Sequence, residues 1–158
     1  MVDQSVLAEL DALQVRYTEA LDGRNMQAWA DCFSQEGSYI CLTRESEEQN
    51  LPLALMMDDN RDRIEDRVNF VTQVWAGTFE DYTMRHIVQR LAVTQKSDAL
   101  YEVKSNFIIA YTTARGKIEI LTSGVYHDEI SLLPGPAFKS KRAVIDSVTP
   151  PRYIVYPL

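Results

Sequence analysis

Residues 100–113, LYEVKSNFIIAYTT, decide the fold of this chain. Apolar and polar side chains alternate along the stretch, which is the pattern of a long β-strand with one buried face. The side chains expected on the buried face are Tyr101, Val103, Phe107, Ile109 and Tyr111, and those expected on the other face are Glu102, Lys104 and Asn106. A strand of this length needs a sheet around it and further elements to cover its apolar face.

Strand patterns also occur on both sides of this stretch. Ala114, Arg115 and Gly116 form a short hairpin loop, so residues 117–130 are expected to return antiparallel, with Gly124 as a bulge or bend. The turn LPGP at 133–136 reverses the chain again. The other expected strands are residues 38–43, 84–94, 138–148 and 153–157.

Helices are expected before the long strands. Apolar residues recur every three or four positions from Ser5 to Leu21, and Gly23 is placed to end that helix as a C′ glycine. A short second helix would put Met26, Trp29 and Phe33 on one stripe.

A third helix is expected after the acidic cluster Asp58, Asp59 and Asp62, because carboxylates suit a helix N-terminus. Its buried face would consist of Ile64, Val68, Val71 and Trp75. Before it, residues 44–50 are expected to form a charged loop, and the apolar run 51–57 is compatible with a strand or a buried loop.

Helices followed by long strands predict an α+β fold in one domain, residues 1–158. We expect three N-terminal helices packed on a curved, largely antiparallel sheet, which is the cone of cystatin-like and nuclear-transport-factor-like folds. The predicted core includes Leu10, Tyr17, Trp29, Phe33, Val68, Phe107 and Ile109.

Charge and composition exclude several classes of partner. The chain has a formal net charge of −7 with its basic residues scattered among acids, whereas a nucleic-acid partner needs a basic stripe. No stretch approaches the ~20 apolar residues of a membrane span, and the opening MVDQSVLAELDAL does not resemble a signal peptide. Cys32 and Cys41 are expected to be buried free thiols in a cytoplasmic protein.

Metal and cofactor motifs are sparse. A Rieske cluster needs two cysteines and two histidines in paired spacing, which this chain lacks. A mononuclear iron site needs two histidines and a carboxylate, and His86 and His127 fall on different expected strands, where they could still converge but are more often structural. Phosphate-binding loops and nucleophile motifs are missing. We therefore expect no catalytic, cofactor-binding or metal-binding residue.

One group of residues leaves an alternative open. In a cone, Tyr17, Asp22, Tyr39 and His86 could line a shared pocket and perform acid–base chemistry. The other interpretation is that the tyrosines are core residues with hydroxyl groups at the rim, and that Asp22 belongs to the end of its helix.

Two stretches are candidates for subunit contacts. The charged run from Arg61 to Arg67, which includes Asp66, is either a solvated helix face or a polar rim against another chain. Tyr82, Arg85 and His86 combine aromatic and cationic groups just after a loop, a composition typical of interfaces. A buried core histidine is the competing interpretation for His86, and Trp29 and Trp75 are assigned to the core.

Five stretches carry a recognisable pattern when they are taken in order. They are RYTEALDGRNMQAWADCFSQEGSY at 16–39, LPLALMMDDNRDRIEDRV at 51–68, YTMRHIV at 82–88, SGVYHDEI at 123–130, and the ending from DS at 146 to YPL. Their order and spacing resemble the small, or β, subunits of Rieske-type aromatic-ring-hydroxylating dioxygenases. The similar members act on aromatic acids such as salicylate, anthranilate or terephthalate. The residues that meet the family pattern are Tyr17, Asp22, Trp29, Phe33, Tyr39, Asp66, Arg67, Val68, Tyr82, Arg85, His86, Ile87, Gly124, Tyr126 and Asp128, whereas His127 falls on a variable position.

The resemblance implies a structural, non-catalytic subunit in aromatic compound catabolism. It implies a cone fold, a self-trimer through the sheet, and a hexamer with three large α subunits. It also implies that the Rieske [2Fe–2S] cluster and the mononuclear Fe(II) belong to the α subunit, which receives electrons from a reductase or ferredoxin. Two other classes share the scaffold: a stand-alone dehydratase or isomerase that uses the His/Asp/Tyr pocket, and a small-molecule-binding module.

Overall fold

A computed structural model describes all 158 residues. The elements, in chain order, are α1 (Gln4–Asp22), α2 (Met26–Ala30), β1 (Phe33–Thr43), α3 (Arg44–Glu48), β2 (Met56–Asp58), α4 (Arg61–Asn69), the π-helix η1 (Phe70–Val74), β3 (Tyr82–Ser97), β4 (Leu100–Thr113), β5 (Ile118–Ser131) and β6 (Ala137–Ile145). None of the helices is long and apolar enough to span a membrane.

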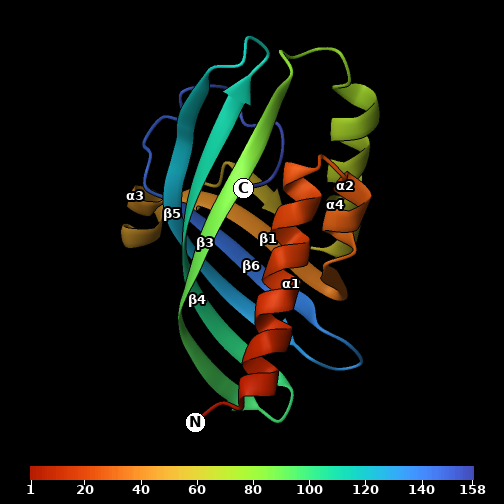
Figure 1. Cartoon of the computed structure of the whole chain (residues 1–158), viewed down its shortest axis with the longest axis vertical. Coiled ribbons are helices and arrows are strands. Elements are labelled where there is room, and N and C mark those ends of the chain that lie inside the picture. The colour runs from red at the N-terminus through yellow and green to blue at the C-terminus, as the bar shows by residue number, and fades with distance from the viewer.

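All six strands belong to one sheet, in the order β2-β1-β6-β5-β4-β3. Every neighbouring pair is antiparallel except β1 and β6, which run parallel. The sheet curves around α1, and α2 and α4 lie beside it (Figure 1). The predicted α+β fold with a curved, largely antiparallel sheet is therefore confirmed.

The strand at Leu100–Thr113 has the predicted bounds, and its side chains alternate between buried and exposed as expected. The predicted core is also confirmed, because all seven residues named for it are at most 9% exposed. Aromatic rings join the layers at its centre. The ring of Tyr17 on α1 makes edge-to-face contacts with Phe33, Tyr126 and Phe138, which come from three different strands.

Gly124 lies at a close approach between strands. A Cβ atom there would overlap the main-chain oxygen of Val144 and would stand 2.9 Å from Cζ of Phe107. The register shift between β4 and β5 falls instead at Ile109 and Ala110. The predicted bulge is thus misplaced by a few pairs along the ladder, and the glycine is needed for space.

Two boundaries before α4 differ from the prediction. Phe33 begins β1 rather than sharing a helix stripe with Trp29, although the two rings still pack 5.2 Å apart. The expected charged loop at 44–50 contains α3, because the Thr43 side chain accepts a hydrogen bond from the Ser46 N–H and caps a helical turn. A cap of this kind outweighs the weak helix signal of a short polar segment.

The run at residues 51–57 is neither a full strand nor buried. Leu53 and Leu55 are largely exposed, and only its end enters β2. Asp58 lies in β2 and not in the helix, since Asn60 is the residue whose side chain caps α4.

The last expected strand, at 153–157, is wrong. No strand follows β6, yet Val155, Tyr156 and Leu158 are buried against the core. Their main-chain groups bond to tyrosine hydroxyls instead of to a neighbouring strand.

Two single residues also differ from the prediction. Gly23, expected as the left-handed C′ residue that ends α1, has a helical φ, and the left-handed residue is Arg24 with φ of 57°. Trp75 is only partly buried.

Candidate functional site

A cleft of about 470 Å³ lies between α1 and the inner face of the sheet, the face that the helices cover. Leu10 from α1 and Val88, Val103 and Ile130 from three strands form its apolar walls. The polar residues of the lining include Gln14, His86 and Asp128, and the side chains of the last two are fully buried. His86 and Asp128 lie on the same face of the sheet because every second residue of a strand points to that face.

His86 is tied to the end of α1. Its Nδ1 atom lies 2.6 Å from Oδ1 of Asp22, and its main-chain N–H also donates to that carboxylate at 3.1 Å. A carboxylate only accepts, so Nδ1 donates the proton in this hydrogen bond. Nε2 is buried and has no hydrogen-bond partner.

Lys141 and Asp128 form a fully buried ion pair, with Nζ 2.9 Å from Oδ2. The ammonium group also donates to Oε1 of Gln14 at 3.0 Å, and it lies 3.8 Å from the ring centre of Tyr126 and 4.4 Å from that of Tyr17. Burial raises the pKa of Asp128 and lowers the pKa of Lys141, and their mutual attraction opposes both changes.

Sequence reasoning missed the lysine of this pair. Lys141 lies in the run KSKR of β6, where nothing distinguishes it from the partly exposed Lys139. Asp128 was noticed only as part of the resemblance. The inward position of Lys141 follows from its register opposite Asp128 and Tyr39, which is a tertiary fact.

The four residues of the predicted pocket do not all meet. Asp22 and His86 are bonded, but Tyr17 and Tyr39 turn toward the end of the chain. The hydroxyl of Tyr17 donates to the main-chain oxygen of Leu158 at 2.6 Å, and that of Tyr39 accepts from the Leu158 N–H at 2.8 Å. Burial raises the pKa of both phenols well above the usual value. The tyrosines therefore anchor the terminal segment.

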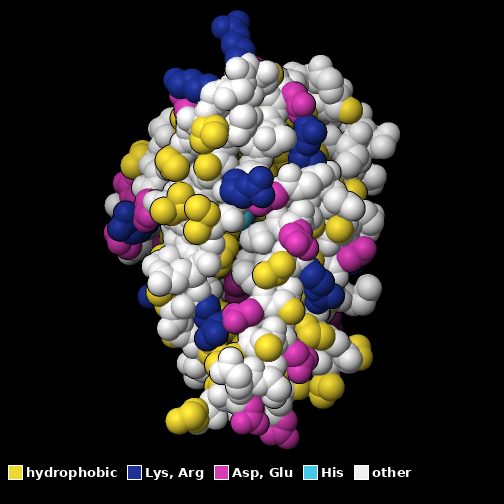
Figure 2. Space-filling model, viewed as in Figure 1, with side chains coloured by type: hydrophobic (Ala, Val, Ile, Leu, Met, Phe, Trp, Pro, Cys, Tyr) yellow, Lys and Arg dark blue, Asp and Glu magenta, His cyan; other side chains and the backbone are white.

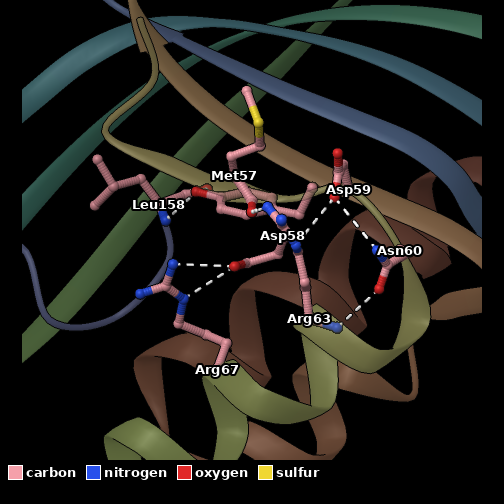
Figure 3. Close-up of polar contacts among 8 residues, drawn as sticks. Met57, Asp58, Asp59, Asn60, Arg63, Arg67 and Leu158 are labelled. Atoms are coloured by element: carbon pink, nitrogen blue, oxygen red, sulfur yellow. Dashed lines mark hydrogen bonds and ion pairs between the residues drawn. The ribbon is translucent and has the colours of Figure 1, made fainter.

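A second polar group lies where β2 meets α4 (Figure 3). Arg67 donates two hydrogen bonds to the carboxylate of Asp58, at 2.9 and 3.0 Å. Its guanidinium also lies 6.0 Å from the ring centre of Trp75. Asp66 is exposed beside it, and Phe70 is 45% exposed. The C-terminal end of the charged run thus forms a largely buried ion pair between Arg67 and Asp58, with the exposed ring of Phe70 nearby.

The stretch at the start of β3 is divided between two faces. Tyr82 and His86 point inward and are buried, whereas Arg85 is exposed on the outer face. The hydroxyl of Tyr82 accepts hydrogen bonds from the N–H groups of Val155 and Tyr156. Of the three residues, Arg85 is the one that a partner could reach in this conformation.

The cysteines and histidines do not fit an iron–sulfur cluster. His86 is held by Asp22, while His127 lines a separate, outer pocket with Lys104 and Arg142. Burial raises the pKa of Cys32 to about 11 and that of Cys41 to about 12, which disfavours the thiolate that a metal needs. The structure contains no group of three or more His, Cys, Asp or Glu side chains placed to hold a metal.

Comparison of the sequence with known protein families identifies the family of this chain. The family described as ring hydroxylating beta subunit matches residues 16–149. The anthranilate 1,2-dioxygenase small subunit of Burkholderia cepacia is 27% identical over 146 residues, which cover 92% of this chain and 89% of that protein.

Two solved structures share the fold. The β subunit assigned to an aromatic-ring-hydroxylating dioxygenase of Novosphingobium aromaticivorans superposes with a TM-score of 0.87 at 21% identity, and 98% of each chain is covered. The β subunit of the benzoate 1,2-dioxygenase of Burkholderia mallei gives 0.74 at 18% identity, with 92% of each chain covered. Because the family match extends over most of the sequence, this chain belongs to the ring hydroxylating beta subunit family.

Proposed function

We propose that this chain is the structural, iron-free small subunit of an aromatic-ring-hydroxylating dioxygenase that acts in the catabolism of an aromatic acid. The observation that carries the proposal is the family match over residues 16–149. The relative named anthranilate 1,2-dioxygenase small subunit supports an aromatic acid as the substrate class.

The outer face of the sheet supports assembly. Ile87, Ile108 and Ile120 are 63%, 45% and 59% exposed, and Ile87 pairs directly with Ile108 across β3 and β4. Figure 2 shows hydrophobic side chains gathered over the strands on the left of the view. Contiguous exposed apolar residues typically mark a protein contact. We assign this face to the contact among three copies of the chain.

The large α subunit would reinforce that trimer, giving three copies of each chain. Arg85, Asp66 and Arg67 are our candidates for the polar part of the contacts, because arginine near aromatic groups is common at interfaces. The exposed Phe70 near Arg67 would supply apolar area.

Iron would be supplied by the partner. The thiols and imidazoles of this chain are dispersed or already bonded, so the Rieske [2Fe–2S] cluster and the mononuclear Fe(II) are assigned to the α subunit. That subunit would receive electrons from a reductase or ferredoxin. Both cysteines are free, which suits the reducing cytoplasm.

Co-expression with the large subunit tests the proposal. We expect both chains to co-purify, light scattering to report three of each, and ring hydroxylation to require the large subunit and its reductase. The chain alone should contain no stoichiometric iron by metal analysis and no visible iron–sulfur absorption. An iron–sulfur chromophore in the isolated chain, or a complex that holds a single copy of it, would contradict the proposal.

The bonded pair of His86 and Asp22 favours a second candidate, a stand-alone dehydratase or isomerase. That chemistry also needs an acid or oxyanion donor near the base. The lining of the cleft contains no tyrosine, because Tyr17 and Tyr39 bind Leu158. The structural role is preferred because the family model matches residues 16–149.

A further inference from the structure

We infer that residues 148–158 form a strap that opens and closes as one unit while the rest of the fold stays intact. This inference is independent of the proposed assembly and chemistry. After β6 the chain continues without helix or strand (Figure 1). No residue after Asp146 takes part in a hydrogen bond between two main-chain groups, whereas every strand of the sheet is joined to a neighbour by a ladder of such bonds.

The composition of the strap explains why it leaves the sheet. Pro150, Pro151 and Pro157 have no N–H group to donate, so these positions cannot take part in a continuous ladder. The last main-chain bond of the chain runs from the N–H of Asp146 to the oxygen of Ser123, at 2.8 Å. Beyond that point the strap's buried main-chain groups find their partners on side chains.

Tyrosine hydroxyls from the rest of the fold supply those partners. The hydroxyl of Tyr82 on β3 accepts from the N–H groups of Val155 and Tyr156, at 3.2 and 3.4 Å. The hydroxyl of Tyr39 on β1 accepts from the N–H of Leu158 at 2.8 Å. The strap is therefore attached through side chains at two separate strands.

Opening of the strap disrupts only a small part of the core. The hydrophobic cluster contains 32 residues, and those that belong to the strap are Val155, Tyr156 and Leu158. Arg152 adds one contact, with its guanidinium 3.7 Å from the ring centre of Tyr82. A segment with few buried side chains and no ladder opens at a lower free energy than the whole domain.

The strap controls access to one end of the cone. The hydroxyls of Tyr17, Tyr39 and Tyr82 all bond to main-chain groups of the strap, so opening frees the three together. In the closed form these tyrosines are at most 2% exposed. Closing thus seals a tyrosine-lined interior, and opening makes it accessible to solvent.

Amide hydrogen exchange of the full-length chain, followed residue by residue by NMR where rates report opening equilibria, tests the inference. Tyr82→Phe removes the acceptor of the Val155 and Tyr156 N–H groups but leaves that of Leu158 in place. If the strap opens as one unit, all three amides should exchange faster by the same factor, about tenfold or more.

Two control variants separate opening of the strap from other effects. Tyr111→Phe removes a hydroxyl that bonds to Glu119 and not to the strap, so exchange of the strap should not change. Val103 lies toward the opposite end of β4 from Thr113, the residue that pairs with Tyr82. Val103→Ala should accelerate the slowest amides of the β4–β5 ladder about tenfold, since these exchange through global unfolding. It should leave the strap amides unchanged, because the contacts of Val103 persist when the strap opens.

If Tyr82→Phe fails to fold, Tyr39→Phe provides the reciprocal test. It removes the partner of Leu158 and should accelerate exchange at Val155 and Tyr156 by the same factor as at Leu158. The inference is wrong if the tyrosine variant accelerates none of the strap amides, or only those whose acceptor it removes. It is equally wrong if Val103→Ala accelerates strap and ladder amides alike, which would mean that the strap opens only when the whole chain unfolds.

Discussion

At the scale of single residues, the ion pair of Lys141 and Asp128 has the largest consequences for stability. We expect Lys141→Met to lower the free energy of unfolding by about 3–5 kcal/mol, because the carboxylate of Asp128 is left buried without its cation. Urea denaturation followed by circular dichroism measures this change.

The double variant Lys141→Met with Asp128→Leu is the matched control. Replacing both charges by apolar groups should restore most of the lost stability, since the penalty comes from one unpaired charge rather than from the missing attraction. A double variant as unstable as the single one would mean that the cation is needed for its contacts with the rings of Tyr126, Tyr17 and Phe138.

The two thiols give a second prediction at this scale. Burial raises the pKa of Cys32 to about 11 and that of Cys41 to about 12, so both remain protonated at pH 8. Because the thiolate is the reactive form, the native chain should react with Ellman's reagent far more slowly than the unfolded chain. Rapid labelling of either cysteine in the folded protein would contradict these pKa directions.

At the scale of elements, the sheet depends on Gly124. Gly124→Ala should destabilise the chain by about 3 kcal/mol or more, because the new methyl group would meet main-chain atoms of Val144 and Ile145 that cannot move aside. Gly135→Ala is the control. No atom lies within 4 Å of a Cβ there, so its effect should stay within about 0.5 kcal/mol. Thermal unfolding of both variants decides the comparison, and equal midpoints would refute the steric argument.

The elements also show how far periodicity predicts structure. The alternation at 100–113 reproduced β4 residue for residue, because a strand's two faces are fixed by backbone geometry alone. The predictions for short segments failed because the structure of such segments depends on contacts with their neighbours and not on their own periodicity. Residues 44–48 are helical through the Thr43 cap, and residues 153–157 are buried without a sheet partner, so neighbours decide in both cases.

At the scale of the whole molecule, the outer face is expected to hold the assembly together. The double variant Ile87→Glu and Ile108→Glu places two paired charges on that face, and it should prevent three copies of this chain from assembling in the complex with the large subunit. The isolated chain should still fold, with a midpoint lowered only modestly by the like charges that face each other across β3 and β4, because both positions are exposed.

Val148→Glu with Tyr153→Glu is the corresponding control. These positions are 76% and 85% exposed and lie outside the sheet, so the same two charges there should leave the complex intact. Size-exclusion chromatography with light scattering distinguishes the two pairs. If the outer-face variant assembles normally, the contact lies elsewhere on the surface.

The sequence by itself determined the fold class, the core and the family. Each of these depends on patterns that can be read along the chain without knowing which segments touch: a period of two or 3.6, a glycine before a turn, or short motifs in a fixed order. Tyr17, Trp29 and Phe107 could be assigned to the core because apolar faces must be buried in whichever fold forms.

Only the tertiary structure decided which polar groups meet. Asp22 and His86 are 64 positions apart, and Gln14 and Lys141 are 127 positions apart. No local pattern encodes such pairs, because they depend on the register of β3 and β6 and on the angle at which α1 crosses the sheet. The same geometry turned Tyr17 and Tyr39 away from the expected pocket and toward Leu158, whose main-chain groups needed partners after the chain left the sheet.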